Sequence, residues 1–132
     1  MGLEGDVRDD DYIVPIGKAD VKREGTDITV VAFAWMVQEA LAAAETLDKE
    51  GISVEVVDPR TLVPMDSETI RASVRKTGRL LVADEAGPTA GASAEIISLA
   101  TEDPETFKTL RAPVSRVCAL DAPIPYLSLI HI

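Results

Sequence analysis

The chain has 132 residues, of which 46% are hydrophobic, and a formal net charge of −10 at pH 7. A chain of this length buries roughly two-thirds of its unfolded surface, so we expect one compact domain with a single core. The acidic surface disfavours nucleic-acid and anionic-membrane partners, because like charges repel, and it leaves a basic protein partner open. An acidic surface also serves solubility alone.

Cysteine and histidine are too scarce for a disulfide or a zinc site, since Cys118 is the only cysteine and His131 the only histidine. No apolar run approaches the ~20 residues that span a bilayer. The N-terminal "MGLEGDVRDDDY" is acidic where a signal peptide is basic and then apolar. We therefore expect neither secretion nor membrane insertion, and a reducing, cytoplasmic location.

Apolar periodicity and Gly or Pro breakers predict strands that alternate with helices. A lead-in, "YIVPIGKADVKREG", is expected to hold an edge strand. The predicted strands are residues 27–35, 52–58, 79–84 and 114–120, and the predicted helices are 36–50, 67–77 and 92–102, with a short helical turn at 104–110. Because parallel neighbours need crossover connections, this order predicts a three-layer α/β/α domain with a mostly parallel sheet.

The first predicted helix has the clearest pattern in the chain. Gly51 follows it as a left-handed C-cap. Cys118 is expected to be a small buried residue in the last strand. The face of the first helix that packs on the sheet is predicted to hold Met36, Ala40, Ala43, Ala44 and Leu47.

Two loops follow strands at the carboxyl edge of the predicted sheet, where ligands and partners of such sheets meet the protein. The first is "DPRTLVPMD", in which Asp58 is expected to pair with Arg60 and Asp66 to cap a helix. The second is "DEAGPTAG", which begins with Asp84 and Glu85. Consecutive residues of an extended segment point to opposite faces, so these two carboxylates are not expected to share an acid-base site.

The second loop lacks the glycine pattern of a phosphate-binding turn. "EAGPTAGASAE" contains Gly87 and Gly91 but neither GxGxxG nor a Gly-Lys-Ser/Thr ending. Gly91 is therefore interpreted as a residue that lets backbones approach closely. The residues alone indicate no catalytic residue, no cofactor ligand and no metal ligand. They indicate a structural domain whose polar loops gather at the carboxyl edge of the sheet.

Several stretches resemble one enzyme family. "GISVEVVDPRTLVPMDSETIRASVRKTGRLLVADEA", "APVSRV" and "DAPIPY" are similar to the C-terminal domain of the β subunit of thiamine-diphosphate-dependent 2-oxo acid dehydrogenases, the decarboxylating components of pyruvate, acetoin and branched-chain complexes. The resemblance covers residues 12–126. It implies a transketolase C-terminal-like domain at 16–126, preceded by an interdomain linker remnant at 1–15.

The resemblance also implies partners and a cofactor. In that family the domain supports an α2β2 heterotetramer with the α subunit and a second β subunit, and it helps to dock the basic binding domain of the acyltransferase. Thiamine diphosphate, held with Mg, lies between the α subunit and the N-terminal domain of β, so this fragment alone is expected to bind no cofactor and to be inactive. The residues expected at the interface are Arg60, Thr61, Asp66, Asp84, Glu85 and Gly91.

The chain departs from the family pattern in three places. "PTAGASAEI" stands where many relatives have Thr-Gly-Gly-Phe, so the contact of that loop is expected to differ. Arg111 stands where some relatives use an acid to hold the basic acyltransferase domain, and a like charge weakens that contact. The final "LSLIHI" (127–132) matches the translation of a transposon end used in sequencing libraries. We therefore expect a non-native tail, in which His131 has no function, and an internal methionine at Met1.

Two other functions are compatible with the sequence. One is a free-standing α/β protein-interaction module with an acidic binding edge, and the other is the C-terminal domain of a transketolase-like synthase. The identity of the 2-oxo acid is not encoded in these residues, because acyl selectivity is expected to be set elsewhere in the active site.

Overall fold

A computed structural model describes residues 9–122 of the chain, and the predictions for residues 1–8 and for the tail at 127–132 lie outside this range. The elements in chain order are β1 (Asp20–Arg23), β2 (Ile28–Ala32), α1 (Met36–Asp48), β3 (Val54–Asp58), α2 (Ser67–Thr77), β4 (Leu80–Ala83), α3 (Ala92–Thr101), α4 (Pro104–Thr109) and β5 (Ser115–Val117). Among the described residues, no helix is both long and apolar enough to cross a bilayer.

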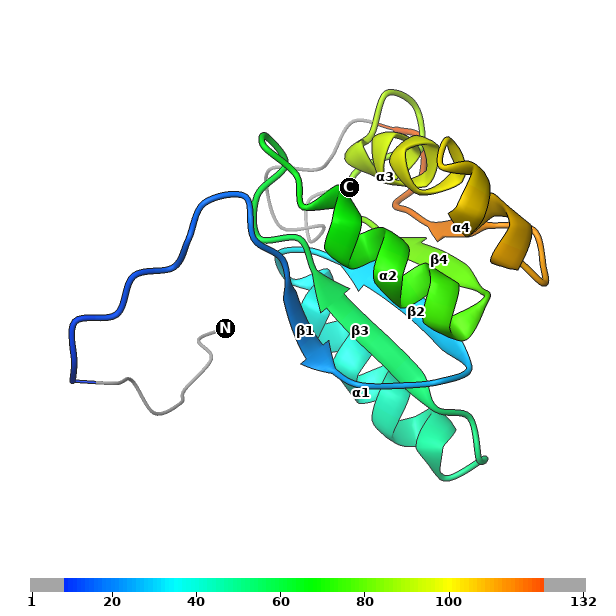
Figure 1. Cartoon of the computed structure of the whole chain (residues 1–132), viewed down its shortest axis with the longest axis horizontal. Coiled ribbons are helices and arrows are strands. Elements are labelled where there is room, and N and C mark those ends of the chain that lie inside the picture. Colours follow the sequence, from blue (N-terminus) through cyan, green and yellow to red (C-terminus); the bar gives the residue numbers. More distant parts are fainter. Residues whose placement is uncertain (1–8, 123–132) are drawn as a thin grey trace, which may run out of the picture.

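The strands form one sheet in the order β1-β3-β2-β4-β5 (Figure 1). β2 pairs in parallel with β3 and β4, and β5 pairs in parallel with β4. β1 is an antiparallel edge strand on β3, with an irregular register between Val21 and Arg23. The predicted mostly parallel sheet and the edge strand in the lead-in are therefore confirmed.

Helices cover both faces of the sheet, because successive strand residues turn to opposite sides. Val30 in β2 packs in the cluster under α1, whereas its neighbour Val31 packs in the cluster under α2 and α3. Figure 1 shows α1 on one side of the sheet and α2, α3 and α4 on the other. The three-layer architecture is thus confirmed.

Three local predictions need correction. Ala43 is exposed, and the buried face of α1 uses Val37 with Ala40 and Ala44. The strand predicted at residues 27–35 ends at Ala32, because the chain turns at Ala34, which has left-handed backbone with φ of 53°. Cys118 lies just beyond β5 and is only half-buried, with its sulfur 3.5 Å from the Ser93 hydroxyl oxygen.

A polar layer lies between α2 and the sheet. Glu55, in the middle of β3, is only 1% exposed. Its carboxylate accepts the Gly25 N–H at 3.1 Å and the Ser73 hydroxyl, and it pairs with the Lys76 ammonium. Because buried charges are costly without partners, these contacts fix how α2 sits on β3.

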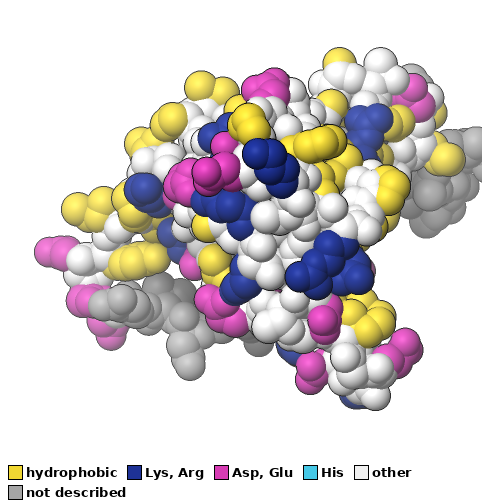
Figure 2. All heavy atoms as spheres, turned by 45° about the vertical axis from the view of Figure 1, so that its right-hand side comes forward, with side chains coloured by type: hydrophobic (Ala, Val, Ile, Leu, Met, Phe, Trp, Pro, Cys, Tyr) yellow, Lys and Arg dark blue, Asp and Glu magenta, His cyan; other side chains and the backbone are white. Residues whose placement is uncertain are grey.

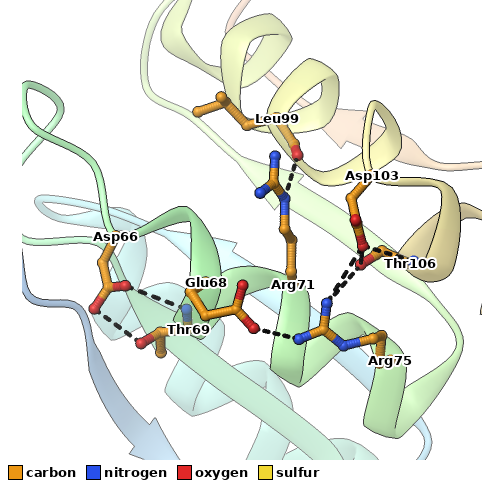
Figure 3. Close-up of polar contacts among 8 residues, drawn as sticks. All are labelled: Asp66, Glu68, Thr69, Arg71, Arg75, Leu99, Asp103 and Thr106. Carbon is orange, nitrogen blue, oxygen red and sulfur yellow. Dashed lines mark hydrogen bonds and ion pairs between the residues drawn. The ribbon is translucent and has the colours of Figure 1, made fainter.

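Two arginines of α2 hold the helices on this face together (Figure 3). The Arg71 guanidinium donates to the Leu99 carbonyl of α3 at 2.8 Å. Arg75 donates to the Thr106 hydroxyl, within α4, at 3.1 Å. It also pairs with Asp103, just before α4, at 3.3 Å. α2 is therefore anchored both to the sheet and to its neighbouring helices. The loop that precedes it, residues 59–65, ends at this fixed helix.

Candidate functional site: the carboxyl edge of the sheet

The loop after β3, residues 59–65, is folded back on the chain. The Asp58 carboxylate accepts the Arg60 N–H at 2.9 Å, and Arg60 has left-handed backbone, with φ of 60°. The Arg60 guanidinium pairs with Asp20 at 2.6 Å, at the start of β1. The expected ion pair between the side chains of Arg60 and Asp58 is therefore wrong, because the Asp58 carboxylate accepts the backbone N–H of Arg60 and the guanidinium pairs with Asp20.

Thr61 joins the same loop to the lead-in. Its hydroxyl oxygen accepts the Gly17 N–H at 3.1 Å, and the hydroxyl donates to the Pro64 carbonyl at 2.7 Å. The Val63-Pro64 peptide bond is cis. The side chain of Thr61 thus closes the loop from inside.

Asp66 caps α2, as predicted, and also holds the lead-in. Its carboxylate accepts the Thr69 N–H at 3.3 Å and the Thr69 hydroxyl at 2.9 Å, shown in Figure 3, and the Ala19 N–H at 3.2 Å. Burial acts to raise the pKa of the Asp66 carboxyl, but these hydrogen bonds and the Lys18 ammonium lower it overall. Asp66 is therefore a charged tie between α2 and the lead-in.

Large apolar side chains are exposed on the loop after β3 and on the lead-in, beside the polar side chains that hold these two segments together. Leu62 and Val63, at the tip of the loop, are 45% and 92% exposed. Residues 9–19 form an arm that leaves the body of the domain, as Figure 1 shows, and Gly17 of this arm lies against Pro64. The large apolar side chains exposed on the arm are Tyr12, Ile13, Val14 and Ile16.

The second loop, after β4, is organised by Asp84. This carboxylate is 2% exposed and accepts the Ala86 N–H at 2.9 Å and the Ser93 N–H at 3.2 Å. Gly91 lies beside it, and a Cβ on Gly91 would stand 2.6 Å from the Gly87 carbonyl oxygen. Gly91 therefore permits a close backbone approach within this loop, and its expected place at an interface stays a prediction.

Glu85 points the other way, as its place next to Asp84 predicts. It is exposed and accepts the Trp35 N–H at 2.9 Å, which ties the loop after β4 to the loop after β2. The Trp35 indole N–H donates in turn to Glu39 at 3.0 Å. The two adjacent carboxylates therefore stabilise two different loops and do not form a common site.

Arg111 lies at the opposite edge of the sheet. Its N–H donates to the Gly78 carbonyl at 2.8 Å, and its side chain lies against Gly78, just before β4 begins. Arg111 is exposed. It belongs to a different surface from the six residues predicted at the interface.

The carboxyl edge offers hydrogen-bonded turns and little reactive chemistry. Within residues 9–122, no group of three or more His, Cys, Asp or Glu side chains is placed to hold a metal ion. Asp66 and Asp84 each accept two backbone N–H groups, so their carboxylates hold loops in place and are not presented as oxygen ligands for the magnesium diphosphate of thiamine diphosphate. The arrangement is suited to binding a surface.

Comparison with known proteins assigns the family. The family model "Transketolase, C-terminal domain" matches residues 17–130. The chain is 47% identical over 121 residues to "Pyruvate dehydrogenase E1 component subunit beta" of Bacillus subtilis, covering 92% of this chain and 37% of that protein. It is 42% identical over 125 residues to "Acetoin:2,6-dichlorophenolindophenol oxidoreductase subunit beta" of Cupriavidus necator, covering 95% and 36%.

A solved structure agrees with the sequence comparisons. A chain of "Split gene transketolase, inactive beta4 tetramer" matches with a TM-score of 0.74 and 32% identity, over 89% of this chain and 37% of that one. The chain spans about a third of the length of the curated relatives it matches. It therefore belongs to the transketolase C-terminal domain family, with β subunits of pyruvate dehydrogenase among its relatives.

Proposed function

We propose that this chain is the C-terminal domain of the β subunit of a 2-oxo acid dehydrogenase decarboxylating component, and that it serves subunit association. The observation that carries the proposal is the carboxyl edge, where Arg60, Thr61, Asp66 and Asp84 all hold loops in place. A site for chemistry needs groups that are free to act on a substrate, whereas a docking surface needs a fixed shape.

The activity belongs to the whole complex. We propose that an α subunit and a second β subunit complete an α2β2 heterotetramer, which decarboxylates a 2-oxo acid oxidatively and transfers the acyl group to lipoyl groups. Thiamine diphosphate with Mg would be held by parts of the complex other than these residues. The single cysteine and the acidic surface suit a cytoplasmic complex.

One residue, Arg111, opposes docking of the acyltransferase on this domain. The exposed guanidinium of Arg111 would face a basic binding domain with a like charge. A transketolase-like synthase remains the second candidate, and the structural likeness to a split-gene transketolase favours it. The higher identity to dehydrogenase β subunits, 47% against 32%, favours the dehydrogenase.

Exchange of domains tests the proposed function. Residues 9–122 would replace the matching C-terminal part of the B. subtilis β subunit, and the hybrid would be co-expressed with the B. subtilis α subunit. We expect a heterotetramer by sedimentation velocity, with thiamine-dependent decarboxylation of pyruvate. A hybrid that folds, as judged by circular dichroism, but does not associate with the α subunit would contradict the proposal.

The isolated 132-residue chain gives a second test. We expect no heat of binding when it is titrated with thiamine diphosphate and magnesium at micromolar concentrations, and no decarboxylation. Saturable micromolar binding would show that this domain itself holds a cofactor, and the assembly role would then be insufficient.

A further inference from the structure

A surface cavity of about 430 Å³ lies at the amino edge of the sheet, where β2, β3 and β4 begin (Figure 1). Five residues from three connections line it: Asp27, Ile28, Gly51, Ile52 and Arg79. A volume of this size falls within the range of small-molecule sites in proteins. The cavity lies at the opposite end of the parallel strands from the carboxyl edge, so it is separate from the surface described above.

Arg79, just before β4, supplies the positive charge of the cavity. Its side chain is exposed, and its guanidinium donates to the Asp27 carbonyl at 3.0 Å. This is the one hydrogen bond that the guanidinium makes within residues 9–122. Since a guanidinium has five N–H donors in a planar fork, most of them remain for a ligand. A carboxylate is the group that this fork binds best.

The opposite side of the cavity has negative character. One oxygen of the half-buried Asp27 carboxylate accepts the Ser53 N–H at 2.7 Å, and the other accepts no hydrogen bond from the part of the chain that the structure describes. Gly51 follows the C-terminal end of α1, where the helix dipole is negative. The exposed side chains of Lys49 and Glu50 have opposite charges and offset each other. This side of the cavity therefore favours a cationic group.

Ile28 and Ile52 give the cavity an apolar wall. Ile28 is half-buried and packs against the cluster under α1, and Ile52 is 38% exposed. Gly51 has a φ of 81°, and a Cβ on it would meet no atom within 4 Å, so the space beside Ile52 is open. The amino edge is turned forward in the lower right of Figure 2, where Lys or Arg side chains border hydrophobic and acidic ones.

We infer that this cavity binds an apolar α-amino acid of about the size of leucine. The carboxylate of the ligand pairs with Arg79, its ammonium group with the free oxygen of Asp27, and its side chain covers Ile28 and Ile52. A 2-oxo acid has no ammonium group for Asp27, and an alkylamine has no carboxylate for Arg79. The inference goes beyond the proposed function and does not depend on it, because it concerns the opposite edge of the sheet.

Titration of the isotope-labelled 132-residue chain with L-leucine, followed by nuclear magnetic resonance, tests the site. We expect saturable shifts of the amide signals of Ile28, Gly51 and Ile52, with a Kd on the order of 1 mM for so small a ligand. The 2-oxo acid that corresponds to leucine, and isoamylamine, should each bind at least about tenfold more weakly, because each lacks one of the two charged hydrogen-bonding groups.

Variants assign the roles of the two charged residues. Arg79→Ala should weaken leucine binding at least about tenfold, and Arg79→Lys should restore part of it. Asp27→Asn keeps an acceptor for the Ser53 N–H but loses the charge, so it should narrow the difference between leucine and its 2-oxo acid. Arg111→Ala is the matched control: Arg111 is exposed beside Gly78 but does not line the cavity, and its loss should leave leucine binding unchanged.

Three results would overturn the inference. The first is the absence of saturable shifts at the cavity at tens of millimolar leucine. The second is equal binding of leucine and its 2-oxo acid, which would identify a site for carboxylates in general. The third is unchanged leucine binding by an Arg79→Ala variant whose circular dichroism matches that of the parent. None of these results bears on subunit association, which the exchange of domains tests separately.

Discussion

Replacing Glu55 by leucine tests whether the polar layer under α2 fixes the helix on the sheet. The change leaves the buried Gly25 N–H without its acceptor, which costs about 1–3 kcal/mol. It also removes the charge-assisted hydrogen bond from Ser73, about 1.5–3 kcal/mol. The ion pair with Lys76 adds only about 0–1 kcal/mol, because the lysine is 41% exposed and retains Glu24.

Burial of the leucine side chain offsets part of this loss, by roughly 1–2 kcal/mol. We therefore expect a net destabilisation of about 2–4 kcal/mol, which lowers the melting temperature of a domain this size by about 10 °C. Glu55→Gln keeps an acceptor for Gly25 and should lose only about 1 kcal/mol.

Urea unfolding followed by far-ultraviolet circular dichroism measures these differences at pH 7. Glu45→Leu, on the exposed side of α1, is the control and should stay within about 0.5 kcal/mol of the parent. If Glu55→Leu also stays within that range, the polar layer does not hold α2 and the reasoning is refuted.

Other changes probe the carboxyl edge. Gly91→Ala should destabilise by about 1–3 kcal/mol in the same assay, because its Cβ would stand 2.6 Å from the Gly87 carbonyl oxygen; an unchanged midpoint would disprove the close approach. Asp66→Asn should lower stability at pH 7. The folded-state pKa of Asp66 lies below the ordinary 3.8, so its carboxylate stabilises the fold above about pH 5, and the difference between variant and parent should shrink as melts are taken toward pH 2. Arg60→Ala should cost under about 1 kcal/mol, since its pair with Asp20 is part-exposed, but should speed hydrogen exchange at the base of the arm; unchanged exchange would remove its positioning role.

Local patterns were sufficient to predict the layers and the helix cap. The nearly continuous apolar run of β2 indicates a strand covered on both faces, and Asp66 directly precedes the first residue of α2. Gly91 was identified because a loop between a strand and a helix often needs a close backbone approach. These features depend on neighbours in sequence, and sequence patterns report such neighbours well.

Partners distant in sequence could not be predicted in the same way. Arg60 pairs with Asp20, 40 residues away, and Glu55 accepts the N–H of Gly25, 30 residues away. One signal was available: Glu55 shares with Val57 the strand face that packs under α2, and a carboxylate at such a position indicates a buried polar partner. Exposure of Val63 had no such signal, because a loop sequence does not show which side chains its turns bury.

The path of the arm also determines how the domain would respond to mechanical force. The arm enters β1 at Asp20, and β1 runs antiparallel to β3, with Asp20 opposite Asp58 (Figure 1). A pull on the arm along the strand axis, away from the carboxyl edge, would load the hydrogen bonds between β1 and β3 together, in shear, and not one after another. Arg60, Thr61 and Asp66 would share that load. Tension between this domain and whatever precedes it would therefore reach the loop that carries Leu62 and Val63 before it reached the core of the sheet.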